Sequence, residues 1–160
     1  MSENQNYDEI LDLFRRGPEI LDDVLAGVSE EESRFVPAPG KWTIRQIARH
    51  LTDTEIVAGM RLRQIIAEHR PLMAVFDQDM WAEHLHYNEC DVFDSAAKFR
   101  FLRKDMSALL DSLPAAAFLR VGLHPERGAC TLGEWVDRFG THVEKHAGQI
   151  RRAREAWISH

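Results

Sequence analysis

Apolar residues recur every three or four positions along almost the whole of this 160-residue chain, and strand-like alternation is hard to find. That period places apolar side chains on one face of a helix, so it predicts an all-α fold. Four long helices are expected, over residues 7–26, 43–68, 91–113 and 131–157. With no sequence repeats, they predict a four-helix bundle that forms a single domain over residues 1–160.

Proline and capping residues set the ends of the expected helices. Thr43 with Gln46, and Thr131 with Glu134, have the spacing of a capping box and open the second and fourth helices. Proline is costly inside a helix, so the first helix is expected to break or restart at Pro18.

The segments between the helices are longer than minimal bundle turns. One helical turn is expected over residues 29–33 and another over 77–82, with a polar loop from there to residue 89. Residues 119–129 predict a loop or a small ribbon. Connecting loops of about 15 residues usually have a function, here at one end of the bundle.

Composition excludes several classes of protein. The net charge is −6 and no basic stripe is evident, which argues against a nucleic-acid partner. Cys90 and Cys130 form no C-x-x-C pair, so neither a disulfide framework nor a thiolate zinc site is expected. The acidic N-terminus does not look like a signal peptide, and no apolar run approaches the ~20 residues that cross a bilayer. A cytoplasmic protein with reduced thiols and no membrane partner is expected.

Two histidines stand where the last helix is expected to bury apolar side chains. The inner stripe of that helix has the spacing 4, 3, 4, 4, 3, 4 and consists of Trp135, Phe139, His142, His146, Ile150, Ala153 and Trp157. A buried imidazole needs hydrogen-bond partners or a metal, because desolvating it unpaired costs about 1–3 kcal/mol. The i, i+4 spacing places two ring nitrogens on one face at chelating distance.

The pattern differs from the zinc-protease motif H-E-x-x-H. Glu144 lies about 200° around the helix from His142, so it cannot act as the base of that motif. A third ligand must come from another helix, and His50 borders the buried face of the second one. Three histidines from two helices predict a neutral three-nitrogen set with an open coordination position, which is typical of a catalytic site. Three hydrogen-bonded core histidines without a metal are the alternative.

Several segments together resemble a known family. "PGKWTIRQIARHLTDTE", "FDQDMWAE", "HPERGACTLGEW" and "HVEKHAGQIRR" resemble the DinB superfamily, particularly its YfiT-like branch, from about Gly17 to Arg154. The resemblance implies a four-helix bundle with a divalent metal, commonly nickel or zinc, with manganese or iron as further possibilities. Position by position, it implies His50, His142 and His146 as the ligands.

The chain also departs from some members of that family. Arg49 stands where some relatives have a histidine just before the ligand on the second helix. Ala147 and Gln149 stand after the H-x-x-x-H pair, where other relatives have a further histidine. These differences leave the ligand set intact. The resemblance also implies a homodimer, and an activity as a transferase for a low-molecular-weight thiol such as bacillithiol, mycothiol or glutathione, or as a hydrolase.

Both activities follow from one open metal position, which could activate a thiol for attack on an electrophile or activate a water for hydrolysis. A non-catalytic metal-binding module is the competing hypothesis, and a cleft at the open position would distinguish the two. Trp42, Trp81 and His124 are candidates to line pockets for a small-molecule substrate. Asp53 is a candidate to orient an imidazole. No catalytic residue is identified beyond the ligands.

Overall fold

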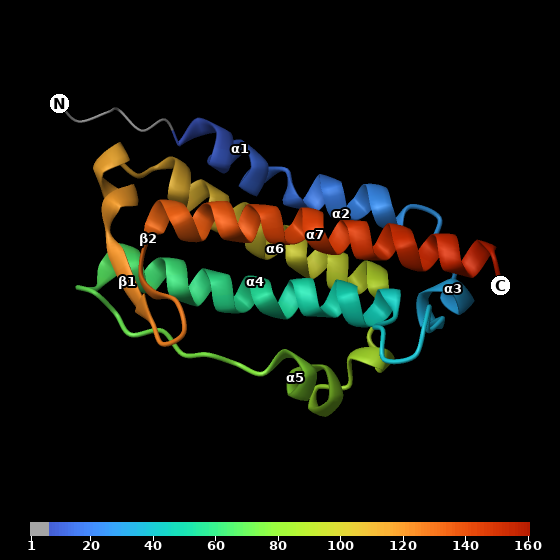
Figure 1. Ribbon diagram of the computed structural model, residues 1–160. Coiled ribbons are helices and arrows are strands. Elements are labelled where there is room, and N and C mark those ends of the chain that lie inside the picture. The colour runs from blue at the N-terminus through green and yellow to red at the C-terminus, as the bar shows by residue number, and fades with distance from the viewer. Residues whose placement is uncertain (1–6) are drawn as a thin grey trace.

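The computed structural model describes residues 7–160 as a bundle of long helices with a two-stranded sheet at one end (Figure 1). In chain order, the elements are α1 (Asp8–Arg15), α2 (Gly17–Leu25), α3 (Glu30–Arg34), α4 (Ile44–Ala67), α5 (Gln78–His84), the 3-10 turn η1 (Tyr87–Glu89), α6 (Val92–Asp111), the 3-10 turn η2 (Ala115–Leu119), β1 (Val121–His124), β2 (Gly128–Thr131) and α7 (Leu132–Ile158). The predicted all-α four-helix bundle is confirmed. Within residues 7–160, no helix combines the length and the apolar character that crossing a bilayer requires.

The bundle has four members, although one of them is built from two helices. In Figure 1, α4 and α7 run antiparallel side by side, α6 lies behind them, and α1 and α2 follow one another along the remaining side. The predicted break falls where expected, since α1 ends at Arg15 and α2 starts with Gly17 and Pro18. The two short helices together contribute one long packing surface.

The predicted capping boxes are both present. Thr43 and Thr131 each accept a hydrogen bond from the backbone of Gln46 or Glu134, whose side chains bind back to the cap. The turn expected over residues 77–82 is α5. The polar loop expected to run on to residue 89 instead contains η1, because Tyr87 is fully buried there and its hydroxyl has a partner in the bundle.

The ribbon expected over residues 119–129 is an antiparallel hairpin of β1 and β2, paired from Val121 with Thr131 to His124 with Gly128. The segment after α4 joins its edge, because Leu123 N–H donates to the Pro71 carbonyl at 2.8 Å and the Leu123 carbonyl accepts from Met73 N–H at 2.8 Å. The hairpin is therefore tied to the end of α4 as well as to α7.

The core consists of two apolar clusters along the bundle axis. The cluster near the C-terminal end of α7 includes Leu21, Leu25, Ile44, Leu51, Phe99, Val143 and Ile150. The cluster beside the hairpin includes Phe14, Leu62, Ile65, Met106, Trp135, Val136 and Phe139. Along α4 and α6, a buried ion pair between Glu55 and Arg103 lies between these two sets.

That ion pair joins every member of the bundle. Arg103 of α6, which is 1% exposed, donates from Nε and Nη2 to the two carboxylate oxygens of Glu55 of α4, both at 2.7 Å. Its Nη1 donates to the carbonyl of Phe14 in α1 at 2.8 Å, and Nη2 reaches the carbonyl of Phe139 in α7 at 3.3 Å. One guanidinium therefore binds groups from α1, α4 and α7.

The break between α1 and α2 makes this arrangement possible. Pro18 has no N–H, so the Phe14 carbonyl lacks the donor four residues ahead that an unbroken helix would supply. The guanidinium of Arg103 supplies that donor instead. Gly17 leaves the room, because a Cβ there would lie 2.6 Å from Arg103 Nη1.

A single and a double variant should show how far the stability of the fold depends on this ion pair. Glu55→Leu should lower the free energy of unfolding by about 3–5 kcal/mol, because it leaves the Arg103 charge buried without a counter-charge. Adding Arg103→Met should recover part of that loss, since no unpaired charge remains. Urea unfolding followed by circular dichroism measures both values. Equal stability of wild type and Glu55→Leu would contradict the assigned role.

Candidate metal centre

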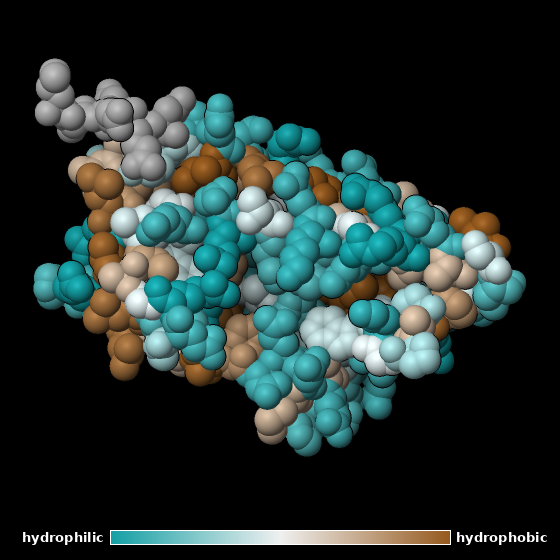
Figure 2. Space-filling view, viewed as in Figure 1, coloured by the Kyte–Doolittle hydropathy of each residue, from teal (hydrophilic) through white to brown (hydrophobic). Residues whose placement is uncertain are grey.

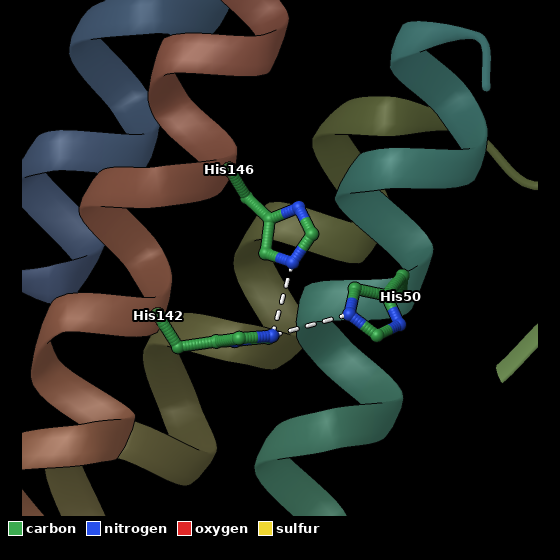
Figure 3. A group of neighbouring side chains, drawn as sticks. All are labelled: His50, His142 and His146. Carbon is green, nitrogen blue, oxygen red and sulfur yellow. Dashed lines mark hydrogen bonds between the residues drawn. The ribbon is translucent and has the colours of Figure 1, made fainter. Parts of the chain in front are cut away.

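The structure brings together the three histidines singled out from the sequence. His50 of α4 and His142 and His146 of α7 point toward one another (Figure 3). The Nε2 atom of His142 lies 3.3 Å from Nε2 of His50 and 3.0 Å from Nε2 of His146. One ligand atom from each ring lies within 4.8 Å of the others, so the group could hold a metal ion.

The packing of α4 against α7 fixes this meeting point. The two histidines of α7 lie one helical turn apart on the face that packs against α4. Leu51 beside His50, and Val143 beside His142, are fully buried in the same apolar cluster. The packed core therefore holds the two backbones that carry the imidazoles at a fixed separation.

Hydrogen bonding among the rings cannot satisfy this cluster. In the ring plane, an imidazole Nε2 offers either one proton or one lone pair, so it makes one good hydrogen bond. The Nε2 of His142 has two nitrogen neighbours, and at most one of those contacts can be a hydrogen bond. A cation accepts all three lone pairs at once, so the donor set fits a divalent metal better than it fits a metal-free core.

Burial keeps the three imidazoles in the form that a metal needs. Desolvation, followed by the nearby charges of His146 and Lys145, lowers the pKa of His50 to about 3. Desolvation also lowers the pKa of His142 to about 2 and is the main cause of the lowered pKa of His146. The rings are therefore neutral near pH 7, with lone pairs available for coordination.

Gln149 orients one of the ligands. Its Oε1 lies 2.7 Å from Nδ1 of His146, and an amide oxygen can only accept. The proton of His146 is therefore on Nδ1, and its Nε2 lone pair faces the cluster. In the sequence, Gln149 stood out only as a difference from relatives, although its place three residues after a ligand could have indicated this contact.

Two further side chains adjoin His50. The Trp42 indole packs edge-on against its ring, with centroids 5.0 Å apart. The Thr54 hydroxyl lies 3.5 Å from its Nε2 atom. The sequence spacing could have indicated this contact, since Thr54 follows His50 by one helical turn.

Asp53, the candidate to orient an imidazole, makes its contacts elsewhere. Its Oδ2 accepts a hydrogen bond from the Tyr87 hydroxyl at 2.8 Å, and its Oδ1 pairs with Arg49 at 2.9 Å. Its carboxylate therefore anchors η1 to α4, and Gln149 is the side chain that orients a histidine of the cluster.

A cleft of about 940 Å³ opens beside the cluster, with His142, His146 and Thr54 in its wall. Hydrophilic side chains gather over α7 on the face seen in Figure 2. Trp42 and His124 line the cleft, as expected from the sequence. Trp81 is not among the lining residues, and its ring instead packs on Phe76, which is, with centroids 4.6 Å apart. The feature expected to distinguish an enzyme from a metal-binding module is thus present.

Comparison with known proteins agrees with this architecture. A protein of Oceanobacillus iheyensis is 29% identical over 92% of this chain and 83% of its own, and one of Bacillus licheniformis is 27% identical over 90% and 84%. The names of both assign them provisionally to metal-dependent hydrolases.

The solved structure of YfiT from Bacillus subtilis, described as a probable metal-dependent hydrolase with an unusual four-helix bundle topology, matches with a TM-score of 0.79. It is 24% identical, and the match covers 95% of this chain and 89% of YfiT, which shows a common fold. The family model described as the DinB superfamily matches residues 13–150. The resemblance seen in the sequence is confirmed, and the chain belongs to the DinB superfamily.

Proposed function

We propose that this chain is a divalent-metal-dependent enzyme that acts on a small molecule in the cleft, with hydrolysis as the first candidate reaction. The observation that carries the proposal is the convergence of three neutral ring nitrogens beside an open cleft of about 940 Å³. The names of the relatives support the same reaction class.

Zinc and nickel are the proposed metals. Imidazole ligands suit both, whereas manganese prefers oxygen ligands, and the three residues that would hold the ion are His50, His142 and His146. Held there, a divalent cation supplies Lewis acidity, which lowers the pKa of a coordinated water or thiol.

The surrounding side chains prepare the site for that chemistry. Gln149 keeps a proton on His146 Nδ1 and so leaves Nε2 free to bind. The Trp42 indole covers one edge of His50 and limits the access of water to it. The Thr54 hydroxyl, 3.5 Å from His50 Nε2, is placed to hydrogen-bond a group that enters the cleft.

Thiol transfer is the second candidate, and the size of the cleft favours it. Small-molecule pockets usually measure about 300–1,000 Å³, and this one lies near the upper end of that range. A cleft of that size has room for a low-molecular-weight thiol and an electrophile together. A transferase requires both reactants at once, whereas a hydrolase requires one organic substrate and water.

Elemental analysis of the untagged protein tests the metal site. Wild type should contain about one equivalent of zinc or nickel after reconstitution, and the His142→Ala, His146→Ala variant should lose it, because one remaining imidazole is a poor ligand set. His84→Ala is the matched control, since His84 is exposed on α5 and should not affect metal content. Equal metal in wild type and the double variant would place the ion elsewhere.

Activity measurements on the metal-loaded protein separate the two reactions. A panel of activated esters and amides, measured without thiol, should be hydrolysed by wild type at least 10-fold faster than by the double histidine variant. Turnover of an alkylating electrophile that appears only with an added thiol would identify a transferase instead. Failure of both assays with metal bound would favour the non-catalytic module.

The stability of the metal-free protein should depend on pH through the same histidines. The pKa values of these histidines are lowered in the folded chain from an ordinary value of 6.5. The unfolded chain therefore binds protons that the folded chain does not, so the free energy of unfolding is highest above pH 6.5 and falls as the pH drops below it. Each such histidine should contribute a slope of up to about 1.4 kcal/mol per pH unit between pH 6.5 and 5.

Urea unfolding at a series of pH values checks this expectation. The control is a variant with leucine at positions 50, 142 and 146, which should lose most of the slope because it has no imidazole to protonate there. The same slope in wild type and the leucine variant would show that other groups cause it.

A further inference from the structure

The wall of the cleft is strongly basic, although the chain as a whole carries a net charge of −6. Glu126 is the one carboxylate among its lining residues. The lining cations are Lys41, Arg61, Arg127, Arg138, Lys145 and Arg152. Fixed charges of one sign in a concave site attract ligands of the opposite sign.

Among the residues that the structure describes, ion pairs are common for the other lysines and arginines of the chain but absent for these six. Half of the twenty lysines and arginines form ion pairs with aspartates or glutamates. Within residues 7–160, none of the six cleft cations is in such a pair. Outside the cleft, 10 of the remaining 14 lysines and arginines are paired within residues 7–160, so unpaired positive charge is concentrated in the cleft.

Arg61 is the strongest evidence that this charge serves a ligand. Its side chain is buried, at 8% exposure, beside the indole of Trp135, with Cζ 5.2 Å from the ring centroid. Nη2 donates to the Ala74 carbonyl at 2.6 Å, but Nε is buried and has no hydrogen-bond partner. A buried cation with an unsatisfied donor is costly unless an anion completes it.

Three side chains near Arg61 add further hydrogen-bond donors. Trp135 Nε1 is also buried without a hydrogen-bond partner. The His124 ring lies 5.5 Å from the Trp135 ring, and its Nδ1 accepts from the Glu126 backbone N–H at 3.2 Å, which leaves its proton on Nε2. The guanidinium of Arg138 lies 5.8 Å from the same indole.

We propose that this end of the cleft is a subsite for an oxyanion group, a carboxylate or a phosphate, carried by the substrate. Arg61 Nε, Trp135 Nε1 and His124 Nε2 supply its hydrogen bonds, and Arg127 and Arg138 supply additional charge. The subsite itself is independent of any metal, whereas its part in selecting a substrate rests on the proposed function.

The helices set the length of the ligand that would reach both places. Trp135 precedes His142 by seven residues, which is two turns or about 10 Å along α7. Arg61 follows Thr54 by the same interval on the antiparallel α4. The substrate class is therefore an elongated small molecule with an anionic group about 10 Å from the group that reacts at the histidines.

Ligand binding to the metal-free full-length chain tests the subsite apart from catalysis. The probes are glutarate and inorganic phosphate, with uncharged glutaramide as the control, and thermal shifts are compared at matched low ionic strength. At least one of the two anions should raise Tm in a saturable manner through binding to the folded state, and glutaramide should not. The anion with the higher affinity identifies the group that the subsite prefers.

Variants assign that binding to residues. Arg61→Met should weaken binding about 10-fold or more, because it removes a charged donor. Arg63→Met is the matched control, since Arg63 lies on the same helix but pairs with Asp105 at an exposed position. This variant should bind the anion with the affinity of wild type. Trp135→Phe keeps most of the ring and removes Nε1, so it should weaken binding several-fold and gives a second reading if Arg61→Met folds poorly.

Stability of the variants separates a ligand role from a structural one. Arg61→Met should unfold at the same or a higher temperature than wild type without anion, because it removes an unpaired buried charge. Absence of anion binding in wild type would overturn the proposal. Unchanged affinity in both Arg61→Met and Trp135→Phe would overturn it as well. If metal-loaded wild type binds the anion but hydrolyses no substrate, the result counts against the proposed function alone.

Discussion

One buried guanidinium sets the relative positions of the helices in this bundle. Arg103 binds the Glu55 carboxylate and the carbonyls of Phe14 and Phe139, which belong to three other helices. Because an unpaired charge in the core is costly, the helices must meet in the register that satisfies all its donors. Glu55 follows His50 by five residues on α4, so the same register brings that histidine to its partners on α7.

The cleft combines two kinds of polar group that burial affects in opposite ways. The histidines lose their charge, because desolvation lowers their pKa values and leaves lone pairs that suit a cation. Arg61 keeps its charge, because an arginine pKa that burial lowers still lies far above neutral, and it presents protons that suit an anion. One wall of α4 and α7 therefore carries acceptors at one place and donors two turns away.

Much of this could be predicted from the sequence, because it depends on local patterns. Periodicity and capping boxes predict the long helices, and the i, i+4 histidines together with His50 predict the cluster. The rest depends on contacts between distant segments. Arg103 looks like an ordinary helix residue until Pro18 leaves a carbonyl without a donor, and Tyr87 looks exposed until η1 meets Asp53. The homodimer and the single domain over residues 1–160 remain predictions.

The hairpin of β1 and β2 has a consequence for how proteins of this shape can diversify. It carries His124, Glu126 and Arg127 on one wall of the cleft, yet it is attached to the bundle mainly through its strands and the segment after α4. If the cleft binds the proposed anion, changes in the turn between the strands would alter its binding without disturbing Arg103 or the histidines. Arg61 and Trp135 of the proposed subsite share α4 and α7 with the histidines, whereas the hairpin adds a part of it that can vary while the histidine cluster stays fixed.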